Sequence, residues 1–176
     1  MAADYPTRIR SLHRQLGIPA DYAAERHLPL QREATRLASV GPAADDGKPV
    51  RLIPSAARAW RRMQAAAARD GINLLPLSGF RSVARQARII RRKRAAGQPL
   101  TAILQFVAAP GHSEHHTGRA LDLGTSGHVS LDSDFGRTAA FRWLRKHAAQ
   151  FGFRLSYPRN NRHRIGYEPW HWCWHN

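Results

Sequence analysis

Two histidine-rich clusters in the second half of the chain contain the residue types that bind a divalent metal. The first runs from His112 to Asp122 (His-Ser-Glu-His-His-Thr-Gly-Arg-Ala-Leu-Asp), and the second from Glu168 to His175 (Glu-Pro-Trp-His-Trp-Cys-Trp-His). Two imidazoles and one carboxylate form an open zinc site, which leaves a fourth position for water. Such a site lowers the pKa of that water to about 7, and a free carboxylate nearby removes its proton. The clusters therefore indicate metal-assisted hydrolysis.

The second cluster alternates tryptophan with polar residues, a period-two pattern that predicts a strand. Pro169 indicates that Glu168 lies on a turn before that strand, where it can converge with His171. A lone buried histidine is more often a hydrogen-bonded core residue, but a carboxylate three positions away weakens that interpretation for His171. Cys173 and His175 stay open as extra ligands, although a packed thiol and a frayed terminus are the more ordinary interpretations.

In the first cluster, the small residues Gly118 and Ala120 allow the backbone to pass close to a bulky group. His115 and Asp122 are seven residues apart, so a ligand on a loop and a ligand on the adjoining strand can meet at one metal. His116 has the same side chain as its neighbour, and spacing does not choose between the two.

Both clusters resemble the motifs of one family. Residues 113–122 resemble the pattern Ser-x-His-x-x-Gly-x-Ala-x-Asp, and residues 168–171 resemble Glu-x-Trp-His. Together these motifs are similar to those of the D-alanyl-D-alanine carboxypeptidase family, which includes vancomycin-resistance D,D-peptidases and L,D-carboxypeptidases. Residues 78–82 (Ser-Gly-Phe-Arg-Ser), followed by Gln86, resemble a further family segment, in which tyrosine is commoner than Phe80. The resemblance covers about residues 72–174.

The resemblance implies a role for each matched residue. Zinc would be bound by His115, Asp122 and His171, and Glu168 would be the general base. Arg81 would bind the substrate terminus or the developing oxyanion, which suits a guanidinium. The peptide would also be bound by Ser113 and Gln86.

The implied substrate is a peptidoglycan stem peptide, from which a C-terminal D-alanine is removed. A cell-wall endopeptidase of phage-lysin type would use the same metal site, so it is the nearest alternative. Neither D,D nor L,D specificity follows from the motifs.

Helical and strand patterns suggest how these residues are positioned. Apolar spacing predicts helices over residues 5–16 and 55–69, and the second has Ala56, Trp60, Met63 and Ala67 along one face. Further helices are expected from Val83, over 101–107, and from Phe141 to Phe151, and strands over 72–77, 119–123 and in the tail. Helices precede strands without regular alternation, which favours an α+β fold. The resemblance implies a small antiparallel sheet that carries the zinc site and is flanked by helices, as in hedgehog signalling domains.

Length and charge set the remaining expectations. A chain of 176 residues fits one peptidase domain, residues 1–176, on which residues 1–50 pack as an extension of helix and loop. The net charge of +16 implies attraction to polyanions. The basic run at residues 91–94 is more simply the solvated face of a helix than a nucleic-acid patch. A nucleic-acid- or polyanion-binding protein is the alternative from another class, and salt-dependent binding without a metal would favour it.

Cysteine count and hydropathy bear on compartment and assembly. A single cysteine excludes an internal disulfide, and no apolar stretch is long enough to span a bilayer. The first six residues show no basic segment followed by an apolar run, so no secretory signal is expected. The expected location is cytoplasmic, with the cell envelope as the alternative if the chain is exported or released. A monomer is expected, and nucleic acid is not the expected partner.

Overall fold

The computed structural model of the chain describes residues 4–176. Residues 1–3, which belong to the segment read for a secretory signal, lie outside this part. Helix α1 (Tyr5–Leu16) begins after Asp4, whose carboxylate accepts a hydrogen bond from the Thr7 amide, and ends at the left-handed Gly17. The other helices and 3₁₀ turns are α2 (Tyr22–Glu25), α3 (Pro54–Arg69), α4 (Val83–Ala95), α5 (Leu100–Phe106), η1 (Glu114–Thr117), η2 (Ser133–Arg137), α6 (Ala139–His147) and η3 (Ala148–Phe151).

Four antiparallel strands form the central sheet, in the order β3-β4-β6-β5. Asp122 on β4 is the direct cross-strand partner of His171 on β6, so both side chains lie on the same face of the two inner strands. The α+β fold with a small antiparallel sheet is therefore confirmed. The strands are β3 (Leu74–Ser78), β4 (Ala120–Thr125), β5 (Phe153–Leu155) and β6 (His171–Trp174).

A separate two-stranded ribbon, β1 (Ala38–Pro42) and β2 (Pro49–Leu52), lies in the stretch for which the sequence predicts only helix and loop. Glycine and proline in this stretch are typical of loops, and the sequence signal for strands is correspondingly weak. The ribbon forms because Val50 and Leu52 are buried against the main core, where β1 and β2 contact α3 and β3. These contacts are distant in sequence, so local patterns do not report them.

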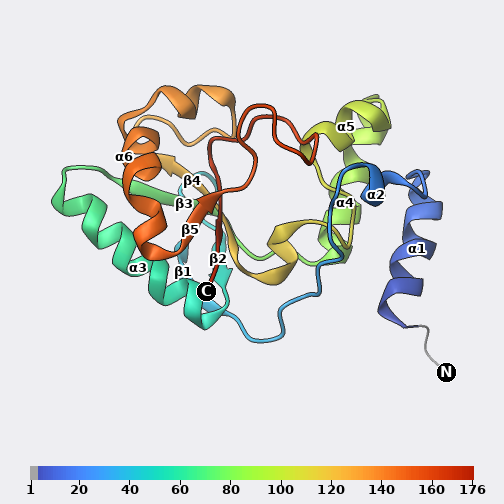
Figure 1. Cartoon of the computed structure of the whole chain (residues 1–176), viewed down its shortest axis with the longest axis horizontal. Helices are drawn as coiled ribbons and strands as arrows, with labels where there is room; N and C mark the ends of the chain where they lie inside the picture. The colour runs from blue at the N-terminus through green and yellow to red at the C-terminus, as the bar shows by residue number, and fades with distance from the viewer. Residues whose placement is uncertain (1–3) are drawn as a thin grey trace.

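The apolar residues form two clusters, which correspond to the two ends of the molecule (Figure 1). The main cluster packs α3 and α6 on the sheet, and the predicted face of α3 lies fully buried within it. The second cluster joins α1, α2, α4 and α5. Strands β4 and β6 contribute residues to the main cluster, and β4 also contacts the turn η1.

The segment between α2 and β1 lies along the loop that carries η1. The Gln31 amide donates to the Gly111 carbonyl, and the Ala34 amide donates to the His116 carbonyl. The Glu33 carboxylate accepts a hydrogen bond from the Val83 amide at the start of α4. The N-terminal part of the chain thus supports both the η1 loop and α4.

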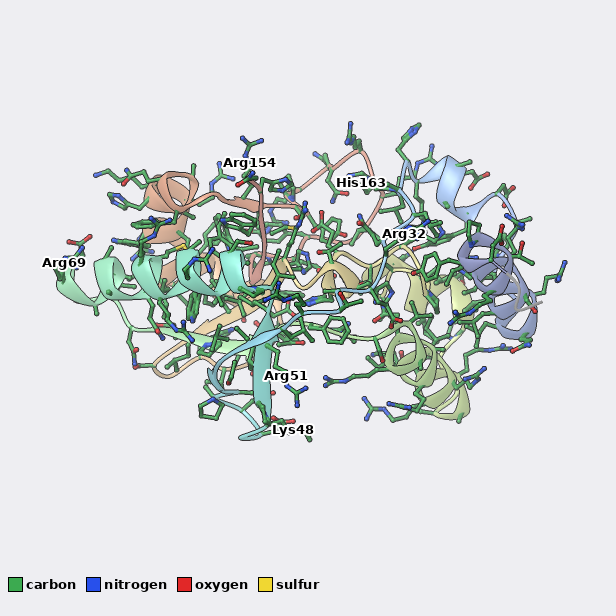
Figure 2. The ribbon with its side chains drawn as sticks, turned by 90° about the horizontal axis from the view of Figure 1, so that it is seen from below. Arg32, Lys48, Arg51, Arg69, Arg154 and His163 are labelled. Carbon is green, nitrogen blue, oxygen red and sulfur yellow. The ribbon has the colours of Figure 1, made fainter. Side chains whose placement is uncertain are left out.

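Basic side chains project from several sides of the molecule, as Arg51, Arg69 and Arg154 illustrate (Figure 2). None of the helices formed by residues 4–176 combines the length and apolarity that crossing a bilayer requires.

Candidate metal centre and active site

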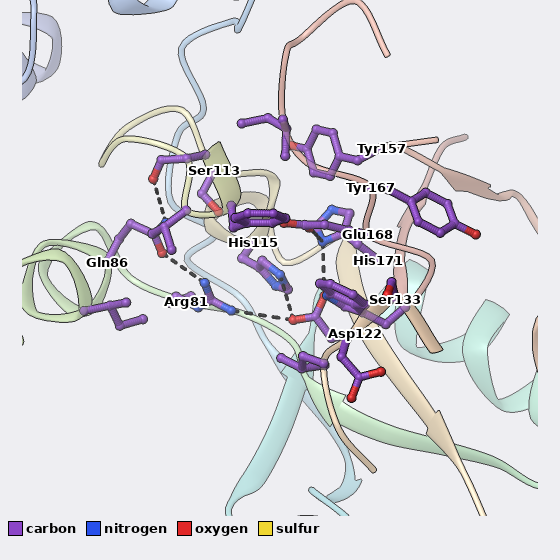
Figure 3. Close-up of a pocket in the computed structure, with 18 of the residues that line it drawn as sticks. Arg81, Gln86, Ser113, His115, Asp122, Ser133, Tyr157, Tyr167, Glu168 and His171 are labelled. Atoms are coloured by element: carbon purple, nitrogen blue, oxygen red, sulfur yellow. Dashed lines mark hydrogen bonds and ion pairs between the residues drawn. The ribbon is translucent and has the colours of Figure 1, made fainter. Parts of the chain in front are cut away.

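A cleft of about 590 Å³ opens between the two apolar clusters (Figure 3). Ile89 and Phe106 from the α4–α5 end line one part of it, and Leu131 and Trp170 from the other end line another. The polar residues along the cleft include every residue to which the family resemblance implies a role: Arg81, Gln86, Ser113, His115, Asp122, Glu168 and His171.

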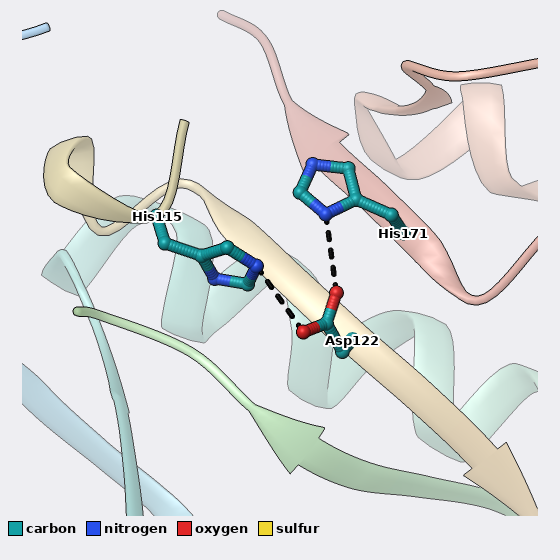
Figure 4. A group of neighbouring side chains, drawn as sticks. All are labelled: His115, Asp122 and His171. Atoms are coloured by element: carbon teal, nitrogen blue, oxygen red, sulfur yellow. Dashed lines mark hydrogen bonds and ion pairs between the residues drawn. The ribbon is translucent and has the colours of Figure 1, made fainter. Parts of the chain in front are cut away.

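Three possible metal ligands meet in this cleft (Figure 4). His115 Nε2 lies 3.2 Å from one oxygen of Asp122, and His171 Nδ1 lies 3.1 Å from the other. All three residues are buried, and one ligand atom from each lies within 4.8 Å of the other two. Two imidazoles and a carboxylate at this separation can hold one divalent ion with a coordination position open to the cleft.

Local structure explains why these side chains converge. Asp122 and His171 are fixed by strand pairing, and His115 is brought to them by the single turn η1. That turn ends at Gly118, whose φ of 65° favours glycine and whose Cβ position is 3.1 Å from the Ile53 amide nitrogen. The same amide donates a 2.9 Å hydrogen bond to the Gly118 carbonyl. Glycine is therefore required where the η1 loop passes the end of β2.

The ring nitrogens distinguish His115 from His116. His115 Nδ1 donates to the Gly79 carbonyl at 2.7 Å, which leaves the Nε2 lone pair facing Asp122. His116 uses both nitrogens on the backbone: Nδ1 donates to the Arg81 carbonyl, and Nε2 accepts from the Gly111 amide. Burial lowers the pKa of His116 to about 4, so this ring is neutral. The structure thus places His115, and not His116, in the donor group.

Glu168 precedes β6 in the turn that Pro169 predicts, and its carboxylate lies 3.8 Å from His171 Nδ1. This is the nitrogen that faces Asp122, so Glu168 lies on the same side of the ring as the other donors. Burial is the main cause of its raised pKa, about 8, and the Asp122 charge adds to the increase while His171 and Arg81 oppose it. Glu168 is a carboxylate that can take up and release a proton near neutral pH.

The pKa values of Asp122 and His171 are linked, because each side chain stabilises the charge of the other. Burial alone would raise the pKa of Asp122, but the charges of His115 and His171 and their hydrogen bonds outweigh it and lower the pKa. Burial alone would lower the pKa of His171, but hydrogen bonds to Asp122 and Glu114 raise it to about 10.

Arg81 reaches the donor group from the segment between β3 and α4. One terminal nitrogen lies 3.6 Å from Asp122 and donates to Ser78 Oγ, and the other donates to Gln86 Oε1. The Gln86 amide in turn donates to the Ala108 carbonyl at 2.7 Å. The Gln86 side chain therefore holds the Arg81 guanidinium in place. A contact between Gln86 and a bound peptide stays a prediction.

Ser113 is buried and precedes η1, where it lines the cleft. Cys173 is buried next to His171 on β6, and burial raises the pKa of its thiol. His175 is exposed beyond the strand. Neither Cys173 nor His175 belongs to the donor group found in residues 4–176.

The sequence analysis assigns no role to Glu114. Its carboxylate lies 2.9 Å from His171 Nε2 and accepts a 2.6 Å hydrogen bond from Ser156 Oγ. Burial alone would raise the pKa of Glu114, but these hydrogen bonds and the His171 charge lower it to about 2. Glu114 stands between two histidines in the sequence, and that position is the only signal that could have indicated it.

Comparisons with known proteins match the region that carries this site. The VanY family, described as D-alanyl-D-alanine carboxypeptidase, matches residues 49–176. YodJ of Bacillus subtilis is 37% identical over 119 residues, which are 66% of this chain and 43% of YodJ. The chain thus spans less than half the length of that relative.

Two solved structures share the fold. The LD-carboxypeptidase LdcB has a TM-score of 0.72 and 31% identity, covering 83% of this chain and 71% of LdcB. A Glu-to-Ala mutant of the vancomycin-resistance D,D-pentapeptidase VanY, in complex with Zn(II), has a TM-score of 0.63 and 26% identity, covering 84% of this chain and 82% of VanY.

Proposed function

The chain belongs to the VanY family of D-alanyl-D-alanine carboxypeptidases, and on this premise we propose that it is a zinc peptidase that removes a C-terminal D-alanine from peptidoglycan stem peptides. The observation that carries the proposal is the group of His115, Asp122 and His171 with the carboxylate of Glu168 beside it. Three ligands would hold the ion, and the fourth carboxyl group would stay free for proton transfer.

The donor set fits zinc, which prefers nitrogen and carboxylate ligands in a four-coordinate site. His115 would bind through Nε2, because its Nδ1 already donates to the Gly79 carbonyl. His171 would bind through Nδ1, and Asp122 between them supplies negative charge. The related VanY structure holds Zn(II), which supports the same ion here.

Each residue then has a defined part in amide hydrolysis. When bound, zinc would supply a water of lowered pKa, about 7, and a polarised substrate carbonyl. Glu168 would take the proton from the attacking water and return it to the leaving amine. Arg81 would stabilise negative charge on the carbonyl oxygen or bind the terminal carboxylate, since its guanidinium is held rigidly by Ser78 and Gln86.

The preferred bond is the finer part of the proposal. LdcB is an LD-carboxypeptidase and VanY a D,D-pentapeptidase, so the family accommodates both kinds of bond. Removal of one terminal D-alanine is common to both specificities. A terminal carboxylate on the substrate would suit the positive charge of Arg81 in the cleft.

Replacing Glu168 with alanine tests the proposal. We expect Glu168→Ala to lose at least about 10²-fold in kcat on peptides ending in D-Ala-D-Ala or in a single D-Ala, because the proton acceptor is gone. Zinc content, measured by inductively coupled plasma mass spectrometry, should stay at the wild-type level. Glu25→Ala, at an exposed position on α2, is the matched control and should behave as wild type.

Two results would contradict this function. Full activity in Glu168→Ala would remove the assigned base. If peptides with amidated C-termini were cleaved equally well, at a bond within the peptide instead of at its end, the protein would be an endopeptidase and not a carboxypeptidase.

A further inference from the structure

Two glutamates approach the imidazole of His171 from opposite sides. Glu168 lies 3.8 Å from Nδ1, the nitrogen that faces Asp122. Glu114 lies 2.9 Å from Nε2, which points away from the donor group. Glu168 therefore faces the donor group, whereas Glu114 can accept a hydrogen bond from the outer nitrogen of the same imidazole.

Glu114 is held in its position by parts of the chain that are distant in sequence. It belongs to η1, directly before His115, and its Oε2 also accepts a hydrogen bond from Ser156, which follows β5. The side chain is 21% exposed, so water screens it only partly. The carboxylate thus links the η1 loop to β6 through His171 and to the end of β5 through Ser156.

A metal-binding imidazole is oriented by what its other nitrogen donates to. For His115 this acceptor is the neutral Gly79 carbonyl. For His171 the nearest acceptor of the outer nitrogen is the Glu114 carboxylate, which carries a negative charge. A charged acceptor makes the ligand more basic and forms the stronger hydrogen bond.

We propose that Glu114 is a positioning residue for the metal centre: it accepts the Nε2–H of His171 and so holds the Nδ1 lone pair toward the ion. The inference rests on the proposed function, since it requires a metal between His115, Asp122 and His171. Glu114 lies across the imidazole ring from these donors and is neither a ligand nor the general base. Its role is to fix ring orientation and to raise the affinity for the cation.

Zinc affinity of the full-length protein, measured by competition with a chromophoric chelator, tests the role directly. We expect Glu114→Ala to bind zinc about 10- to 100-fold more weakly, as the loss of such an orienting partner typically does. Glu114→Gln keeps an oxygen acceptor and loses the charge, so its affinity should lie between those of wild type and Glu114→Ala, at least about threefold below wild type. Glu25→Gln, an exposed glutamate on α2, is the control.

A second measurement distinguishes a changed orientation of the His171 ring from a general loss of structure. Cobalt(II) in place of zinc reports ligand geometry through its visible absorption, and the spectrum should shift in Glu114→Ala and largely recover in Glu114→Gln. Thermal unfolding of the metal-free variants shows whether each one folds. If Glu114→Ala does not fold, the isosteric Glu114→Gln decides by the same threefold criterion.

The inference is overturned if the folded variants bind zinc within about threefold of wild type with an unchanged cobalt spectrum. That result would leave the proposed function intact, because wild type would still bind zinc and cleave the peptide. Failure of the wild-type protein to bind zinc would instead refute the proposed function as well.

Discussion

At the scale of single residues, His115 and His116 show how the backbone assigns different roles to identical side chains. Spacing keeps both open as ligands, and only the family resemblance favours His115. The physical reason lies in carbonyls more than thirty residues away, at Gly79 and Arg81, which take the Nδ1 protons of the two rings. A sequence does not specify such partners, because they depend on the folded path of the chain.

Alanine at these two positions should therefore have opposite effects. His115→Ala removes a ligand, and we expect zinc content to fall to near zero. His116→Ala should keep its zinc but lower the free energy of unfolding by about 1–3 kcal/mol, since the Gly111 amide and the Arg81 carbonyl lose their partner. Metal analysis and urea unfolding of metal-free samples measure the two effects.

The assignment would be reversed if His116→Ala lost zinc while His115→Ala retained it. Equal loss in both variants would mean that η1 as a whole, and not one ring, determines binding.

At the scale of elements, helices were easier to predict than strand partners. The predicted helix over residues 5–16 coincides with α1, and that over 55–69 nearly coincides with α3, because apolar spacing and terminal residues are local signals. The strands around Asp122 and His171 were also expected. Their direct pairing was not, since a register between segments 49 residues apart follows from the whole sheet. The ribbon β1–β2 was missed for the same reason.

Gly79 directly follows β3 and contacts both β2 and the expected metal ligand His115. A Cβ there would collide with the Arg51 carbonyl oxygen at β2, and the Gly79 carbonyl accepts the His115 hydrogen bond. We expect Gly79→Ala to lower the free energy of unfolding by about 1–3 kcal/mol through overpacking. We also expect zinc to bind about tenfold more weakly because the acceptor moves. Calorimetry and chelator competition measure the two.

Gly97→Ala is the control for this substitution. Gly97 has a φ of 83° with open space around its Cβ, so alanine should cost about 1–2 kcal/mol in backbone strain without a change in zinc affinity. Unchanged zinc affinity in Gly79→Ala would show that the β2 contact does not affect the ligand.

At the scale of the whole molecule, the charge is distributed unevenly. Of the twelve acidic residues, three (Asp122, Asp132 and Glu168) line the cleft, and residues 71–113 and 135–167 contain none. Both acid-free stretches border the cleft, through α4 and through the loop before Glu168. The outer surface is therefore more basic than the site, and attraction to anionic polymers should be general and sensitive to salt.

Charge reversal on α4 tests whether this attraction is local. We expect Arg91→Glu with Arg92→Glu, both exposed, to weaken binding to labelled polyphosphate, measured by fluorescence anisotropy, by about tenfold or more at low salt. Cleavage of a small stem peptide should be unchanged. Arg58→Glu with Arg69→Glu on α3 changes the net charge equally and should weaken binding less.

Equal weakening by both pairs would indicate a diffuse effect of net charge. Binding that does not change between about 50 and 200 mM salt would contradict an electrostatic origin altogether.

The segment between α2 and β1 bears on how much of the chain is needed for folding. The family match begins at residue 49, yet Gln31 and Ala34 donate to carbonyls of the loop that supplies the first imidazole, and Glu33 caps α4. A polypeptide trimmed to the recognisable homology would leave those groups without partners and uncover the apolar faces of α4 and α5. The smallest part of the chain that folds on its own is thus expected to be larger than the stretch that matches the family.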